Sequence, residues 1–276
     1  MRRFSNMAIT SYLAHFGLNQ APFGKDTPDA ELWLPPSKEA LVDEFQDAVT
    51  ARESLLLYGE PGVGKTCVLR AVRHRLSSQS FRLTYCHNAL VGRRDFYRQL
   101  CLAMALPPAA TAGALFHTLT AHVQDLRGDR CHPVLFLDEA HLLQQDTLDA
   151  LHILLNYDWD SAPLLSLVLI GLPELQDRLA LRRNRSLFSR LQRRLRIDPL
   201  TPEDTALYLR LRLRRAGCDR DLFTSDALAM LHEAVAGTMR DLDRLAHAAL
   251  REAARKKRRL IERDCIQALL TAPPAA

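Results

Sequence analysis

Short apolar runs alternate with amphipathic segments along the first two thirds of the chain. The runs lie at 54–58, 81–86, 133–138, 164–171 and 195–198. Near-continuous apolar runs of this length are typical of strands that are buried on both faces. Between them lie segments such as CVLRAVRHRL and DFYRQLCLAMAL, whose apolar residues have helical spacing. The pattern predicts an α/β fold, an αβα sandwich around a parallel sheet of five strands.

After the last of these runs, the pattern becomes helical only. Residues 202–270 contain about four segments with helical periodicity. Thr201 followed by Pro202 predicts an N-cap with proline in the first helical position. We therefore expect a core at 37–200, a small all-α domain at 201–270 and a disordered tail at 271–276.

Composition and cysteine spacing narrow the class of protein. The 276 residues are 47% hydrophobic and 25% charged, which is typical of a soluble globular chain. No apolar stretch is long enough to span a membrane, and the N-terminus lacks the apolar core of a signal peptide. Six cysteines stand singly, without CxxC pairs. We expect reduced thiols and a cytoplasmic protein that has no membrane partner.

The positive charge is clustered. The net charge is +5, yet 181–196 carries seven arginines and no acid, and 251–263 is a second basic segment. Such segments suit a polyanion, because neutralised phosphates release counterions. The alternative is a solvated helix face.

One loop matches a phosphate-binding motif. Residues 59–66, GEPGVGKT, fit GxxxxGK[ST] between a predicted strand and a predicted helix. Glycines let backbone N–H groups turn toward phosphate oxygens, and the helix N-terminus adds a positive dipole end. Lys65 is expected to reach the β- and γ-phosphates, and the Thr66 hydroxyl to ligate Mg²⁺. The residues expected to bind ATP in this segment are Gly59, Glu60, Pro61, Gly62, Val63, Gly64, Lys65, Thr66 and Cys67.

A carboxylate pair follows the third apolar run. Asp138 and Glu139 stand where a parallel sheet places its ligands. Asp138 is expected to hold Mg²⁺, and Glu139 to orient and deprotonate the attacking water. A pair of this kind can also simply cap the next helix. The string DEAH at 138–141 resembles that of some helicases, but 276 residues are too few for two helicase lobes.

Together these motifs resemble AAA+ P-loop ATPases. The segments FGLNQAPFGKDTPDAELWLPPSKEALVDEF (16–45) and LVLIGLPELQDRL (167–179) are similar to ATPases of the ExeA type. Such ATPases occur in type II secretion and, in soluble form, as transposition helpers related to the TniB, TnsC and IstB kind. The resemblance implies that residues 1–36 pack on the nucleotide site. The resemblance extends over nearly the whole chain.

The resemblance also implies two catalytic arginines. In AGTMRDLDRL (236–245), Arg240 matches a sensor on the lid that contacts the γ-phosphate. The alternative is a surface arginine paired with Asp241 or Asp243. Before the last strand, Arg190 matches an arginine finger that completes a neighbour's site, with Arg185 or Arg194 as alternatives, and the same arginines can contact DNA. A finger acting in trans implies a homo-oligomer.

One position departs from the family pattern. Related chains carry a polar sensor after the glycine that ends the fourth strand, and here Leu172 follows Gly171. Leucine cannot hydrogen-bond a water or a phosphate. Either Asn184 or another group substitutes, or hydrolysis is slow.

Other contacts implied by the resemblance concern adenine and DNA. Phe23 and Trp33 are candidates for packing on the base, with ordinary core packing as the alternative. In HNALVGRRDF (87–96), Arg93 and Arg94 are candidates for gripping DNA phosphates without sequence preference. Their alternative is plain charge at a helix start.

The resemblance thus implies an ATP-dependent regulator that assembles as a ring or filament on double-stranded DNA and recruits or activates a transposase. Hydrolysis would drive disassembly. Two alternatives are a secretion-type ATPase and a nucleotide-gated adaptor with little turnover. The secretion branch usually continues into a membrane segment and a cell-wall-binding domain, which this sequence lacks, so we expect the transposition branch.

Overall fold

The structure is a computed structural model that describes residues 12–24, 28–29, 32–87 and 91–271. The chain divides into two compact units. One comprises Pro36–Pro61 and Lys65–Ile197, and we call it the sheet unit. The other takes the described residues of Met1–Pro35, Gly62–Gly64 and Asp198–Ala276, and we call it the helical unit. The predicted tail lies almost wholly outside the described residues.

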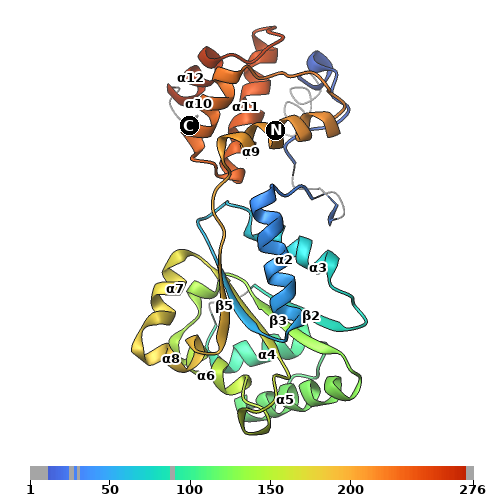
Figure 1. Ribbon diagram of the computed structural model, residues 1–276, viewed down its shortest axis with the longest axis vertical. Coiled ribbons are helices and arrows are strands. Elements are labelled where there is room, and N and C mark those ends of the chain that lie inside the picture. Colours follow the sequence, from blue (N-terminus) through green and yellow to red (C-terminus); the bar gives the residue numbers. More distant parts are fainter. Residues whose placement is uncertain (1–11, 25–27, 30–31, 88–90, 272–276) are drawn as a thin grey trace. The chain divides into compact units, whose positions relative to one another are not determined.

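The sheet unit contains five parallel strands, which confirms the predicted α/β fold. Their order across the sheet is β2-β3-β4-β1-β5, and each neighbouring pair is parallel (Figure 1). The strands are β1 (Ser54–Tyr58), β2 (Phe81–Cys86), β3 (His132–Leu137), β4 (Ser166–Gly171) and β5 (Leu191–Arg196).

Helices cover both faces of this sheet, because the central strands are apolar on both sides. Leu56 packs in one core with side chains of α4 (Arg93–Ala103), α5 (Ala112–Gly128), α6 (Gln145–Leu154) and α7 (Pro173–Ala180). Alternate residues of a strand face opposite sides. On the other face, Phe45 of α2 (Pro36–Thr50) meets Phe136 of β3 with ring centroids 6.1 Å apart, and α3 (Lys65–Arg75) packs beside α2 (Figure 1). The result is the predicted sandwich of three layers.

The last strand begins earlier than the apolar pattern indicates. We expected a strand at 195–198, whereas β5 starts at Leu191 and reads LQRRLR. It pairs only with β1 among the described strands, so one edge and part of its faces are polar. Arg193 is held by Glu53 through a contact of 2.7 Å between Nε and Oε2. A strand with two leucines among three arginines and a glutamine escapes a search for continuous apolar runs.

The helical unit is built from four helices after residue 198, in agreement with the helical periodicity. They are α9 (Pro202–Arg215), α10 (Ser225–Val235), α11 (Met239–Arg255) and α12 (Arg263–Thr271). Thr201 caps α9 as predicted: its hydroxyl accepts the N–H of Asp204, whose carboxylate accepts the N–H of Thr201. The described part of the N-terminal segment belongs to this unit, where Trp33 packs against Tyr208.

Among the described helices, none combines the length and apolar character that crossing a bilayer requires.

Candidate nucleotide-binding site

Both phosphate-site motifs leave the sheet at the carboxyl ends of its central strands. The N–H of Gly59, just after β1, donates to the carbonyl of Gly171 at the end of β4 (3.3 Å). The N–H of Asp138, just after β3, donates to the carbonyl of Cys86 at the end of β2 (2.9 Å). Because β4 lies between β3 and β1, the loop at 59–66 and the carboxylate pair flank one strand end. This edge is where open parallel sheets bind ligands.

The loop at 59–66 has the backbone geometry of an anion cradle. Gly62 and Gly64 have φ values of +81° and +103°, which residues with a Cβ rarely adopt. The loop then enters α3, whose first residue is Lys65. Its Nζ donates to the carbonyl oxygens of Gly59 (2.7 Å) and Glu60 (3.0 Å). The ammonium group is therefore folded onto the loop that a phosphate would enter.

The other loop residues take up different positions. Val63 is fully buried, whereas the exposed Thr66 lies in the first turn of α3. Cys67 is half-buried, and none of the six cysteines, all of them described, forms a disulfide. The loop thus brings a cation and a hydroxyl to the N-terminus of one helix, which is the kind of site that anions occupy.

Asp138 is held at both of its carboxylate oxygens. Oδ1 accepts the backbone N–H of Glu139 at 2.9 Å, and Oδ2 accepts the hydroxyl of Tyr85 at 2.6 Å. Glu139 itself is left-handed, with φ of 53° and ψ of 33°. That conformation costs about 1–2 kcal/mol in an L-residue. The local bond from Asp138 offsets part of this cost and fixes the direction in which Glu139 leaves the strand.

Tyr85 was not singled out from the sequence. It is the penultimate residue of β2, and its side chain is 49% exposed. Burial of the hydroxyl, followed by its hydrogen bond to Asp138, raises the pKa of Tyr85 above its ordinary value, so the hydroxyl keeps its proton and donates. Its position at the carboxyl end of the strand next to β3 is the signal that would have found it.

The turn after Glu139 packs closely on the end of β4. A Cβ at Gly171 would lie 3.3 Å from the backbone nitrogen of His141 and 2.7 Å from Leu175 Cδ2. From α7, Arg178 donates through Nη1 to the carbonyl of His141 at 3.1 Å. The Nδ1 of His141 lies 3.5 Å from Glu139 Oε2. The sequence did not single out Arg178 either, because its partner is a backbone atom.

The position that departs from the family pattern is apolar in the structure too. Leu172 is the half-buried N-cap residue of α7 and provides no side-chain cap. Asn184, the substitute we considered, is buried. Its Oδ1 accepts Gln145 Nε2 at 2.5 Å and its Nδ2 donates to the carbonyl of Arg178 at 2.8 Å. The Asn184 amide therefore ties α6 to α7, and these bonds already use both ends of it.

The arginine-finger candidates lie in and before β5, on three different elements. Arg190 immediately precedes this strand and lines an open hollow of about 510 Å³ with Arg52 and Gln192. Since β5 runs parallel to β1, its start lies at the edge opposite the loop at 59–66. Arg185 begins the short helix α8 (Arg185–Phe188), and Arg194 lies over the Phe188 ring at 3.9 Å. Within one sheet unit, the structure does not bring Arg190 to the nucleotide edge.

Arg240 is the second residue of α11, and its side chain is exposed. Both aspartates considered as its partners bind other groups: Asp241 pairs with Arg244 (3.2 Å), and Asp243 accepts the Tyr208 hydroxyl (2.8 Å). Burial raises the pKa of Asp243.

Of the two residues considered for packing on adenine, Phe23 is half-buried. The contact that Trp33 makes with Tyr208 is of the core-packing kind.

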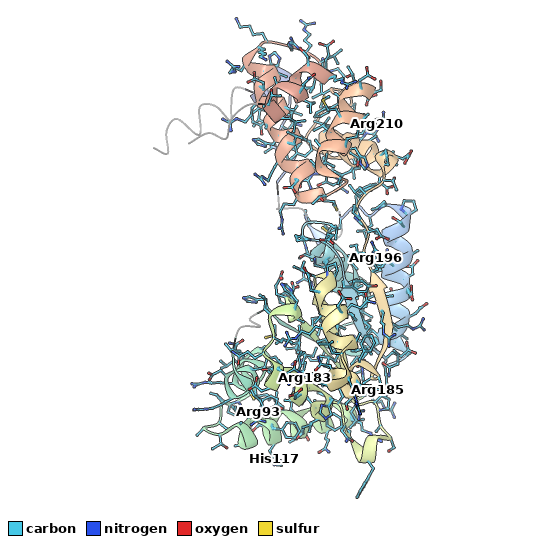
Figure 2. All side chains as sticks on the ribbon, turned by 90° about the vertical axis from the view of Figure 1, so that its left-hand side faces the viewer. Arg93, His117, Arg183, Arg185, Arg196 and Arg210 are labelled. Atoms are coloured by element: carbon cyan, nitrogen blue, oxygen red, sulfur yellow. The ribbon has the colours of Figure 1, made fainter. Side chains whose placement is uncertain are left out.

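The candidate DNA-binding arginines are exposed, but many basic residues are paired. Arg93 and Arg94 begin α4, and their side chains are exposed, while residues 88–90 of that segment lie outside the described part. Figure 2 shows Arg93 and Arg185 on different elements of the sheet unit. The segments 181–196 and 251–263 are not single helix faces. Pairs with acidic residues occupy Arg183, Arg193, Arg255 and Arg258.

The side chains at the carboxyl edge fit a magnesium nucleotide. Mg²⁺ prefers oxygen ligands and usually takes one or two from a protein, with the rest from water and phosphate. The Thr66 hydroxyl and the Asp138 carboxylate are such a pair. No group of three or more His, Cys, Asp or Glu residues suited to a metal occurs among the described residues.

Comparison with protein families gives one match over half of the chain. Residues 38–179 match the family described as AAA domain. The chain is also 32% identical over 242 residues to General secretion pathway protein A of Aeromonas hydrophila. That alignment covers 87% of this chain and 44% of the relative, so the chain spans less than half of the relative's length.

Solved structures share the fold at low identity. Cdc6p from Pyrobaculum aerophilum has a TM-score of 0.65 at 20% identity, over 87% of this chain and 67% of that one. Drosophila ORC bound to DNA has a TM-score of 0.69 at 17% identity, over 96% and 66%. The RuvB Holliday junction branch migration motor of Thermotoga maritima has a TM-score of 0.59 at 17% identity, over 91% of this chain and 72% of that one. At these identities, the likeness concerns the fold alone.

Proposed function

Because the chain belongs to the AAA domain family, within the AAA+ P-loop ATPases, we propose that it binds ATP with Mg²⁺ and hydrolyses it to ADP and phosphate. One observation carries the proposal. The cradle that begins at Gly59 and the carboxylate pair at Asp138 and Glu139 flank the end of β4 at one edge of the sheet. A phosphate-binding loop and a carboxylate pair on neighbouring strand ends are the two halves of a phosphoryl-transfer site.

Each residue of this edge has a role in the proposal. Lys65 and the loop N–H groups neutralise the β- and γ-phosphates, while Thr66 and Asp138 hold the metal ion, which supplies charge stabilisation when bound. Glu139 accepts a proton from the attacking water. Arg240 is the residue that we propose as the sensor of the γ-phosphate.

Completion of the site in trans is part of the proposal. Arg190 lies at the edge of the sheet opposite its own chain's loop, which supports a contribution to the site of a second copy. An arginine supplied in this way makes turnover depend on assembly. With Leu172 at the sensor position, we propose slow hydrolysis suited to a switch.

The finer function we propose is assembly on duplex DNA, followed by recruitment or activation of a transposase. The exposed Arg93 and Arg94 are the candidate phosphate contacts. Two of the similar folds, Drosophila ORC and Aeropyrum pernix ORC1, are structures of DNA complexes. Six cysteines without a disulfide suit a reducing compartment, and we propose the cytoplasm.

A second candidate is a secretion-type ATPase. The 32% identity to General secretion pathway protein A over 87% of this chain favours it. Both candidates share the ATP site, so the two readings differ in the partner rather than in the chemistry.

The test measures ATP turnover and assembly together, with and without random-sequence duplex DNA across a salt series. Magnesium-dependent turnover that is lost in Lys65→Ala supports the ATPase. Rings or filaments on DNA, seen by negative-stain microscopy and lost at high salt, support the DNA-bound regulator. Turnover without DNA association at low salt overturns that regulator and leaves the secretion-type candidate. Absence of both ATP binding and turnover overturns the ATPase itself.

A further inference from the structure

The carboxylate of Asp138 has a partner on the neighbouring strand. Tyr85, the penultimate residue of β2, donates its hydroxyl to Oδ2 of Asp138 over 2.6 Å. The two residues come from strands that pair in parallel register, in which Tyr85 lies opposite Phe136 and Cys86 opposite Leu137. The Asp138 N–H also donates to the Cys86 carbonyl, so backbone and side chain of Asp138 are both fixed to the end of β2.

The same carboxylate also sets the conformation of Glu139. Its other oxygen, Oδ1, accepts the Glu139 N–H at 2.9 Å, and Glu139 has the left-handed φ of 53°. Because each carboxylate oxygen of Asp138 accepts a hydrogen bond, the carboxylate cannot rotate without straining both bonds. The position of one hydroxyl on β2 is therefore transmitted through Asp138 to the residue that we propose as the general base.

The tyrosine is placed for this contact and not for packing. Its side chain is 49% exposed, although it contains a large aromatic ring, and the ring stacks on His87 with centroids 6.0 Å apart. A short hydrogen bond to an ionised acceptor is roughly twice as strong as one between neutral groups. The contact therefore stabilises one orientation of the carboxylate.

We infer that Tyr85 is a positioning residue of the ATP site. Through its hydroxyl, it holds Asp138 in the orientation that binds magnesium nucleotide, and through Asp138 it fixes the backbone conformation of Glu139. This inference rests on the proposed function. Partners that orient a metal ligand typically contribute about 10- to 100-fold to metal affinity or activity. Tyr85 acts through Asp138 and is not itself expected to contact the nucleotide.

The test compares Tyr85→Phe with the unchanged chain and with Tyr97→Phe, a control that removes the hydroxyl of a buried tyrosine of α4. Nucleotide affinity is measured by titration calorimetry twice, once in excess Mg²⁺ and once in EDTA. We expect Tyr85→Phe to leave the EDTA affinity unchanged and to reduce the gain in affinity that Mg²⁺ gives by about tenfold. Turnover at saturating nucleotide should fall by a similar factor. Tyr97→Phe should leave both quantities unchanged.

Three outcomes separate this inference from the proposed function. If the unchanged chain shows Mg²⁺-dependent affinity and Tyr85→Phe keeps all of it, the inference is wrong and the ATPase stands. If Tyr85→Phe loses affinity equally in Mg²⁺ and EDTA, the hydroxyl has a structural role and the inference is again wrong. If the unchanged chain binds no nucleotide under either condition, the proposed function itself fails. Because Tyr85→Phe removes one hydroxyl from a half-exposed side chain, urea titration should show that the variant still unfolds in one cooperative transition.

Discussion

The ammonium group of Lys65 lies 2.7 Å from the carbonyl oxygen of Gly59, at the two ends of a single loop. A second bond of 3.0 Å joins it to the carbonyl of Glu60. Carbonyl dipoles are weaker partners for a cation than phosphate oxygens. The lysine is therefore held over the cradle and can exchange these bonds for contacts with a nucleotide.

We expect Lys65→Ala to weaken ATP binding by about 10- to 100-fold, because a hydrogen bond to a charged group contributes about 1.5–3 kcal/mol. Titration calorimetry in Mg²⁺ measures the change. Lys257→Ala, at an exposed turn residue after α11, is the matched control and should bind ATP as the unchanged chain does. Equal affinity in the Lys65 and Lys257 variants would place the nucleotide elsewhere.

Replacement of Glu139 should separate binding from hydrolysis. In Glu139→Gln the amide keeps the size and the turn but cannot accept the proton of water, so we expect turnover to fall by about 100-fold or more while ATP affinity is kept. Multiple-turnover phosphate release and calorimetry on the same preparation give the two quantities. Asp149→Asn, at an exposed carboxylate of α6, is the control. Undiminished phosphate release by the Glu139 variant would show that another group takes the proton.

The fold was more predictable than the site, and particular residues show why. The strand β1 is predicted by its run of Leu55, Leu56 and Leu57, because a strand buried on both faces needs apolar residues at every position. The start of β5 at Leu191 was not predicted, because the arginines of this strand are stabilised by ion pairs and a ring contact that no hydrophobic periodicity encodes. The other edge strand, β2, was predicted with its observed bounds because its sequence FRLTYC is mostly apolar.

Within the site, sequence reasoning reached the residues that belong to motifs. Asp138 and Glu139 stand in a recognisable string, whereas Tyr85 and Arg178 act on it from strands and helices about 50 and 40 residues away along the chain. Such contacts depend on register and on helix placement. Only the three-dimensional arrangement shows that Tyr85 meets Asp138.

The role of Arg190 can be tested by mixing two defective chains. We expect Arg190→Ala to lower turnover by about 1,000-fold, the lower end for an arginine supplied in trans, with ATP binding retained. A mixture with Glu139→Gln should regain turnover, because an intact glutamate of one chain then meets an intact arginine of the other. Phosphate release from the mixture is compared with that from each chain alone.

Two further results bear on Arg190. Arg185→Ala, five residues earlier in the chain, should keep most of the turnover if Arg190 is the finger. A mixture that stays as slow as its components, despite forming oligomers by light scattering, would rule out a contribution of Arg190 in trans.

The stability of the sheet unit should depend on pH through His132. This residue begins β3, is 6% exposed, and has its Nε2 2.8 Å from Ser166 Oγ. Burial, and then the charge of Arg52, lower the pKa of His132 to about 4. Below the ordinary histidine pKa of about 6.5, the unfolded chain takes up a proton that the folded chain refuses. Stability is therefore lost as the pH falls from about 6.5 toward 4.

For this one group, the expected loss between pH 7 and pH 5 is about 2 kcal/mol in the free energy of unfolding. His132→Gln keeps a hydrogen-bonding side chain but does not titrate, so its loss over the same interval should be smaller by about that amount. Urea titrations at both pH values measure the difference, with the exposed His74→Gln as the control. Equal losses in the unchanged chain and in His132→Gln would mean that the folded chain protonates this imidazole as readily as the unfolded chain does. Burial at the start of β3 would then not be the source of the pH dependence.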